Sequence, residues 1–164
     1  MLSQTMEYAL RAVVFLAHEA PLACTTDQIA LATNVPKAYL SKVLQGLVHN
    51  GIVNSQRGLG GGMALAKLAT TLTVWDVVEA VDPIPRIGSC PLEPMRDMGR
   101  LCALHRCLEE ATDRVATLFR MTTLADLLIN NNDDEVYCRF PSVLPTSSRS
   151  VAEAPSSDFK ARDE

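Results

Sequence analysis

The sequence has few aromatic residues, since phenylalanine, tyrosine and tryptophan together make up 5% of its 164 residues. Its hydrophobic core must therefore be filled mainly by leucine, valine, alanine and methionine. It also lacks any apolar run near the roughly 20 residues that a membrane-spanning helix needs. The apolar stretch 9–17 is interrupted by Arg11 and has no basic segment ahead of it, unlike a signal peptide. We therefore expect a cytoplasmic protein without a membrane partner.

A complete disulfide framework is also absent, because the chain has five cysteines and an odd number cannot all pair. In a reducing compartment, thiols more often bind metals or take part in redox chemistry than form structural disulfides. Cys90, Cys102 and Cys107 lie near one another in the sequence, with His105 inside the last interval. Cys24 and Cys138 lie apart from this group, and the sequence indicates no role for either.

Positive charge is scarce outside the N-terminal part of the chain. Residues 1–72 carry five basic and three acidic side chains, a net charge of +2, although the whole chain has a net charge of −4. Residues 73–130 and residues 131–164 each have a net charge of −3. The N-terminal part is thus the only net-positive one, which is a weak indication of a polyanionic partner.

Three helices are predicted in the first third of the chain. Apolar residues recur with the helical period over residues 3–19. Thr25 and Gln28 form the pattern of a capping box, which predicts the start of a short second helix. Pro36 fits the first position of a third helix, and Gly51 can adopt the left-handed conformation that ends it.

A small β-hairpin and a fourth helix follow. Two short strands, 52–56 and 63–66, flank a turn that contains four of the eight glycines. Thr73 caps a helix that ends before Pro83. This order is that of a winged helix-turn-helix, so we predict a mainly α fold with a small β-hairpin wing and a DNA-binding domain over residues 1–82.

The remainder divides into a loop, a long helix and a tail. Residues 83–101, rich in proline and glycine, are predicted to be an irregular loop that carries Cys90. A dimerisation helix is predicted over 102–130, because its apolar positions alternate in steps of four and three, at 104, 108, 111, 115, 118, 122, 125 and 129. Such a stripe needs a cover, either its own domain or, most simply, a second copy in a homodimer. Residues 131–164, rich in serine, proline and charge, are predicted to be a disordered tail.

In a helix-turn-helix, the second helix of the pair enters the major groove of double-stranded DNA. Glutamine can pair with adenine, lysine with guanine or phosphate, and free amides at a helix start with phosphate. No Gly-Lys-Ser or Gly-Lys-Thr follows the glycine-rich turn, which favours a wing over a nucleotide-binding loop. The alternative is that these polar residues are only a solvated face. The predicted DNA contacts are Thr26, Gln28, Lys37, Tyr39, Ser41, Lys42, Gln45, Arg57 and Gly58.

The cysteine group has the spacing C-x11-C-x4-C. Thiolates of this kind suit Zn(II) or an iron–sulfur cluster, and the alternative is a set of small buried thiols in a core. On an ideal helix Cys102 and Cys107 would point about 140° apart, so Cys102 is expected before the regular helix begins. His105 and Cys107 would face different sides of a helix, which is poor geometry for a nucleophile and its base. We therefore predict that the protein is not an enzyme.

Four stretches in this order resemble the IscR/NsrR-type winged-helix regulators, the family of the iron–sulfur cluster-assembly regulator and the nitric-oxide-sensing repressor. With the loop and the long helix, the resemblance covers about residues 1–130. It implies a homodimeric transcription factor that binds a near-palindromic operator. The matching stretches are YALRAVVFLA at 8–17, PKAYLSKVLQGLVHNGIV at 36–53, RGLGGGMALAK at 57–67 and TVWDVVEAVD at 73–82.

The resemblance also implies an iron–sulfur cluster, 2Fe–2S rather than 4Fe–4S, held by Cys90, Cys102 and Cys107. Its fourth ligand would be His105 or, from the partner subunit, Glu7. Such a protein would sense redox state, iron–sulfur status or nitric oxide, and the cluster would set the spacing of the two recognition helices. The first cysteine gap is longer than is usual in the family, which leaves the middle ligand and the cluster type open. A cluster-free regulator that uses its thiols directly and a zinc-stabilised interaction module remain alternatives.

Overall fold

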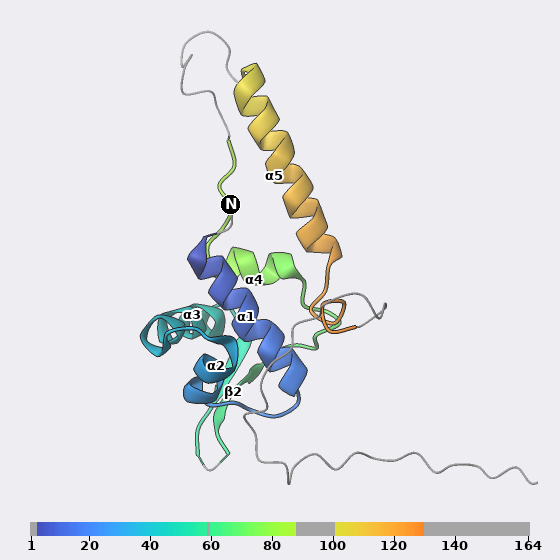
Figure 1. Cartoon of the computed structure of the whole chain (residues 1–164). Coiled ribbons are helices and arrows are strands. Elements are labelled where there is room, and N and C mark those ends of the chain that lie inside the picture. The colour runs from blue at the N-terminus through green and yellow to red at the C-terminus, as the bar shows by residue number, and fades with distance from the viewer. Residues whose placement is uncertain (1–2, 59, 88–100, 130–164) are drawn as a thin grey trace, which may run out of the picture.

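The computed structural model describes residues 3–58, 60–87 and 101–129. These residues form helices, one β-hairpin and a final long helix in the predicted order (Figure 1). Among them, no helix combines the length and apolar character that a membrane span requires. The predicted tail and most of the predicted cysteine loop, including Cys90, lie outside the described residues. The elements are α1 (Gln4–Glu19), α2 (Thr26–Thr33), α3 (Lys37–His49), β1 (Val53–Gln56), β2 (Gly62–Leu65), α4 (Val74–Val81) and α5 (Ala103–Met121).

Helix α1 is the centre of the domain. Ser3 caps it by accepting a hydrogen bond from the amide of Met6 at 3.2 Å. Residues 12–17 are all buried, because α2, α3, α4 and β2 pack around this helix. The sequence predicted a single apolar stripe, whereas the middle of α1 is enclosed on every side.

The sequence signals of the helix pair α2–α3 are confirmed except at the start of α3. The Thr25–Gln28 capping box is present, with the Thr25 amide donating to Gln28 Oε1 at 2.7 Å. Pro36 precedes α3 as its N-cap and is not its first helical residue. The inner face of α3 buries Leu40, Val43, Leu44 and Leu47, whereas Val48 is only half-buried. The outer face of α3 is thereby left to polar residues.

The wing is an antiparallel hairpin tied to the helical core. β1 and β2 pair from Val53↔Leu65 to Gln56↔Gly62. On the other side of β2, Cys24 exchanges two backbone hydrogen bonds with Met63, at 2.9 and 2.7 Å. A Cβ on Gly62 would lie 2.6 Å from the carbonyl oxygen of Cys24, so glycine is required for this close approach.

The long helix is shorter than predicted. α5 begins at Ala103 and ends at Met121, so the predicted helix over 102–130 is wrong in its last part. Thr122 is extended (φ −101°, ψ 116°), and the next residue, Thr123, forms a β-bridge with Thr73 beside the start of α4. Residues 122, 125 and 129 therefore do not belong to the helical seam.

Two local interactions explain this early end. The β-branched side chains of Thr122 and Thr123 disfavour helix. The hydroxyl and the amide of Thr123 donate to Asp126 Oδ2 at 2.7 and 2.8 Å, and these two hydrogen bonds lower the pKa of Asp126. Leu124 can then enter the main core, where it is fully buried. Burial of a leucine stabilises the fold by about 1.5–3 kcal/mol, more than an added turn of exposed helix would.

The rest of the predicted seam lies on α5 and is uncovered. Within α5 only Ala116 is buried, while Leu104, Leu108, Val115 and Leu118 are 59%, 46%, 39% and 62% exposed. An open groove of about 640 Å³ runs between α5, the segment 84–87 and Met6 of α1. Within the described part of the chain, the apolar face of α5 has no cover.

Candidate DNA-binding surface and cysteine site

The outer face of α3 is polar and cationic. Lys37, Tyr39, Lys42 and Gln45 are exposed, and α3 contains no acidic residue. Ser41 is half-buried and donates its hydroxyl to the carbonyl oxygen of Lys37 at 2.9 Å. Four of the predicted α3 contacts are thus exposed to solvent, and the hydroxyl hydrogen of Ser41 is bonded within its own helix.

Lys37 also joins the two helices of the pair. Its ammonium lies 2.5 Å from the carboxylate of Asp27 in α2, and the two side chains are 61% and 71% exposed. An exposed ion pair of this kind stabilises a protein by only about 0–1 kcal/mol. Lys37 can therefore exchange Asp27 for a DNA phosphate at small cost.

Tyr39 is fixed by α1. Its hydroxyl shares a 2.6 Å hydrogen bond with Thr5, and its ring meets the ring of Tyr8 edge to face at 5.4 Å. Gln4 in turn donates to the hydroxyl of Tyr8 at 2.8 Å. The sequence prediction missed Thr5 and Tyr8, because no local pattern links residues more than 30 positions apart. Tyr39 thus positions the start of α3 in addition to being a predicted DNA contact.

The predicted contacts on α2 occupy its first turn. Thr26 is the first residue of α2, where backbone N–H groups point out of the helix end. The side-chain carbonyl of Gln28 accepts the Thr25 amide in the capping box, so it is engaged within its own helix. The available group at this point is the backbone at Thr26.

The wing places Arg57 at its exposed end. Arg57 directly follows β1, and Gly58 and Gly60 have φ angles of 104° and 80°, which favour glycine. A Cβ at Gly61 would lie 2.5 Å from the carbonyl oxygen of Gln56, so this turn needs glycine there too. Figure 1 shows the hairpin projecting beyond α2.

The described cysteine donors lie at the start of α5. Cys102 is the N-cap of α5, which confirms that it precedes the regular helix. Its Sγ lies 3.0 Å from Nδ1 of His105 in the first turn. Cys107 is exposed one turn further on. A helix N-terminus favours a negatively charged thiolate.

The arm that leads to Cys90 is attached to α5. Arg86 pairs with Glu109 at 2.9 Å and also with Asp113. The amide of Ile87 donates to the same Glu109 carboxylate at 2.9 Å. The loop therefore starts beside the helix that carries Cys107.

The donor set fits a thiolate-bound metal group. Two cysteines and one histidine lie within residues 102–107. Glu7 is 53% exposed on α1 and pairs with Arg11. Within the described residues no three potential ligands converge, and the predicted ligand Cys90 lies outside them.

Cys24 is different from the other described thiols. It is fully buried under the wing, and this burial together with the carboxylate of Glu19 raises its pKa to about 11. A buried neutral thiol is unreactive near neutral pH. Its environment indicates a structural residue.

Fold and surface together define a winged helix-turn-helix DNA-binding regulator. Residues 2–130 match the model of the Rrf2 family, described as an iron-dependent transcriptional regulator. The chain belongs to the Rrf2 family. The resemblance and the fold class predicted from the sequence are confirmed.

Relatives from bacteria carry the names of transcriptional regulators. An HTH-type transcriptional regulator of Aquifex aeolicus is 31% identical over 129 residues, which are 77% of this chain and 90% of the relative. The regulator IscR of Erwinia tasmaniensis is 30% identical over 129 residues, which are 77% of this chain and 76% of the relative.

Two solved structures share the fold. The IscR of T. potens superposes with a TM-score of 0.67 at 22% identity, covering 78% of this chain and 85% of that one. CymR, the global cysteine regulator of B. subtilis, superposes with a TM-score of 0.62 at 24% identity, covering 77% and 95%.

Alkylation tests the distinction between the thiols. In metal-free, folded protein at pH 8, we expect iodoacetamide to modify Cys102 and Cys107 and to leave Cys24 unmodified. With a pKa of about 11, only about one Cys24 thiol in a thousand is ionised at pH 8. Its reactivity should rise as the pH approaches 11 or on unfolding in urea. Peptide mass spectrometry over time measures the rates, and equal rates for Cys24 and Cys107 in the folded protein would contradict this assignment.

Proposed function

We propose that this Rrf2-family regulator is a cytoplasmic homodimer that binds a DNA operator and senses redox state, iron–sulfur status or nitric oxide through a cysteine-ligated iron–sulfur cluster. Residues 1–82 supply the DNA-binding surface, the loop 83–101 and the start of α5 supply the ligands, and α5 supplies the dimer contact. The strongest support is the contact of Cys102 with His105 at the start of α5. The loop is attached to this same helix through Glu109.

The proposed ligands are Cys90, Cys102 and Cys107. Cys90 lies three positions after Ile87 in the sequence, and three residues of chain can span at most about 10 Å. Ile87 is bonded to Glu109, two residues beyond Cys107, so the chain length keeps Cys90 within reach of the first turns of α5. When bound, a cluster, proposed to be 2Fe–2S, supplies a redox couple whose potential depends on hydrogen bonds and solvent exposure around it.

The fourth ligand is His105 or, from the partner subunit, Glu7. His105 already lies beside Cys102. Met6, the neighbour of Glu7, lines the same groove as Leu108 and Val115 of α5. A partner helix in that groove would pass beside the first turns of α1, which brings Glu7 close to the partner's cysteines.

The homodimer is proposed from the uncovered seam of α5. Leu104, Leu108, Val115 and Leu118 recur at heptad spacing and are all at least 39% exposed. A second α5 offers the same stripe in return. Such pairing would also fix the distance between the two α3 helices, which must match half-sites about 34–36 Å apart on DNA.

The predicted DNA contacts remain part of the proposal. Lys37, Tyr39, Lys42 and Gln45 would meet the major groove, and Arg57 with Gly58 would meet phosphate or the minor groove. Thr26 would meet a phosphate through its backbone, and Gln28 and Ser41 would contribute through their side chains. A shift of α5 would reach these residues through α4, which packs on α3, and through α1, which holds Tyr39 by Thr5.

One observation favours a second candidate, a cluster-free regulator that uses its thiols directly. An imidazole 3.0 Å from Cys102 can stabilise its thiolate and so promote reaction with oxidants. The zinc-stabilised module without DNA binding has no such support, because the chain belongs to a family of transcriptional regulators.

The DNA-binding surface is tested by Lys42→Ala. We expect weaker binding to a generic duplex and a salt dependence of log affinity shallower by about 1, because one phosphate contact is lost. Lys67→Ala, which removes an exposed lysine outside this surface, is the control and should leave the slope unchanged. Fluorescence anisotropy across a salt series measures both. Equal salt-dependence slopes for wild type and Lys42→Ala would show that Lys42 makes no phosphate contact and is not part of the DNA-binding surface.

The cluster is tested by anaerobic purification of the full chain. We expect a coloured protein with visible absorbance and with iron and sulfide near stoichiometric amounts. Cys90→Ser and Cys107→Ser should each lose most of the iron, whereas the control Cys138→Ser should keep it. A colourless, iron-free protein that still binds DNA would contradict the cluster and favour the thiol regulator.

A further inference from the structure

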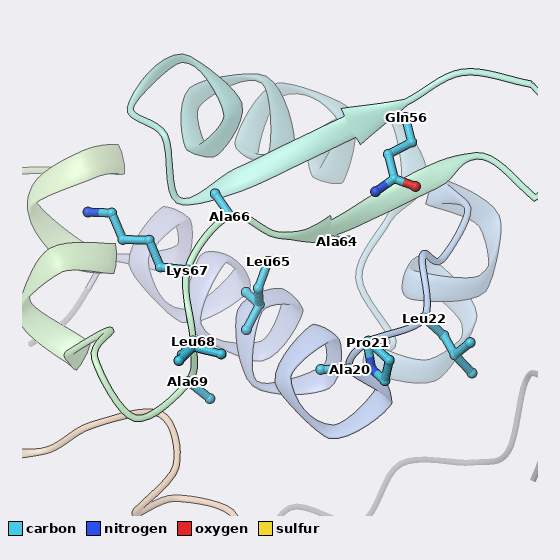
Figure 2. A pocket seen from close by; sticks show the side chains of 10 residues that line it. All are labelled: Ala20, Pro21, Leu22, Gln56, Ala64, Leu65, Ala66, Lys67, Leu68 and Ala69. Atoms are coloured by element: carbon cyan, nitrogen blue, oxygen red, sulfur yellow. The ribbon is translucent and has the colours of Figure 1, made fainter.

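A second apolar groove lies beneath the wing, separate from the predicted DNA contacts and from the cysteines. It has a volume of about 420 Å³ and is formed by the C-terminal end of α1, β2 and the segment that connects β2 to α4 (Figure 2). Leu22 and Leu68 flank it and are 39% and 73% exposed. Pro21 and Leu65 add further apolar surface. Two large exposed leucines at one open groove indicate a docking surface.

The described chain ends next to this groove. After α5, the amide of Leu124 donates to the carbonyl of Leu72 at 2.8 Å, and the amide of Ala125 donates to the carbonyl of Ala69 at 3.1 Å. Ala69 is itself a lining residue of the groove. The described chain therefore ends, at residue 129, four residues after an amide that is bonded to the lining of the groove.

The sequence beyond that point contains a suitable ligand. Residues 130–135, NNNDDE, are polar, and residues 136–145, VYCRFPSVLP, are mostly apolar. Tyr137 and Phe140 are two of only eight aromatic residues in the chain. Six spacer residues can span up to about 20 Å when extended, enough to cross a groove of this size. The apolar segment is thus long enough and close enough to reach Leu68.

Charge favours the same pairing. Three consecutive acids, residues 133–135, precede the apolar segment. Lys67 lies exposed at the groove beside Leu68. An acidic spacer that passes this lysine gains a modest attraction and directs the following residues toward the groove.

We propose that this groove binds residues 136–145 of the same chain. Tethering makes this practicable, because a short flexible linker gives an effective concentration in the millimolar range, so even millimolar intrinsic affinity fills about half of the sites. Gln56 of β1 and Ala64 of β2 line the groove. The docked segment therefore packs against the hairpin that carries Arg57 and stabilises it. The inference depends on neither the cluster nor the dimer.

Disulfide trapping in the full chain tests the docking. The segment already contains Cys138, so the variant Leu68→Cys supplies a partner thiol in the groove. Leu31→Cys is the matched control, because Leu31 is also 73% exposed but lies on α2, outside the groove. After oxidation of metal-free protein, we expect a link from position 68 to Cys138 in at least about ten times the yield of the link from position 31, given the effective concentration at the groove.

Two readouts decide the outcome. Mixing chains with and without nitrogen-15 distinguishes a link within one chain, which is expected, from a link between chains, which would overturn docking in cis. Equal yields at positions 31 and 68 would also overturn it.

In hydrogen exchange of the full chain, Phe140→Asp should speed exchange of the amides of residues 64–69 at least about two-fold, since docking protects them. Unchanged exchange would overturn the bracing of the wing.

Discussion

The apolar seam of α5 is the constraint on which the rest of the molecule depends. Leu104, Leu108, Val115 and Leu118 form one stripe, and the described part of the chain leaves it in water. Each square ångström of such surface costs about 25 cal/mol to expose, so a stable molecule must cover it. Pairing with a second copy would cover the stripe. It would also set where the cysteines at the start of α5 and the two DNA-binding surfaces lie.

Helix α1 links these parts within one chain. Its middle is enclosed by the core, its first turn holds Tyr39 of α3 through Thr5, and Met6 lines the groove beside α5. Helix α5 packs on α4, which packs on both α1 and α3, so a movement of α5 would reach α3 through α4 as well as through α1. Arg86 adds a second link, because it fastens the cysteine loop to Glu109. The cysteines at the start of α5 are thus connected to α3 by packed elements.

Local sequence signals predict most of the helices and strands, but they do not predict contacts between residues far apart in the sequence. The capping box at Thr25 and the left-handed Gly51 are encoded by neighbouring residues, so both were predicted correctly. The heptad pattern predicts a helical seam that continues to residue 129. The helix ends earlier because Leu124 turns into the core. The Tyr39–Thr5 and Arg86–Glu109 contacts join residues more than 20 positions apart, and no sequence spacing indicates them.

Sedimentation equilibrium of the full chain tests directly whether two chains pair through α5. The wild-type protein is expected to have twice the 17.8 kDa mass of one chain at micromolar concentration. Leu108→Asp should shift it to the monomer, because a charge would be buried in the seam, whereas Leu31→Asp, on exposed α2 surface, should remain dimeric. A wild-type protein that sediments as a monomer, or a Leu108→Asp variant that stays as dimeric as wild type, would contradict pairing through the apolar seam of α5.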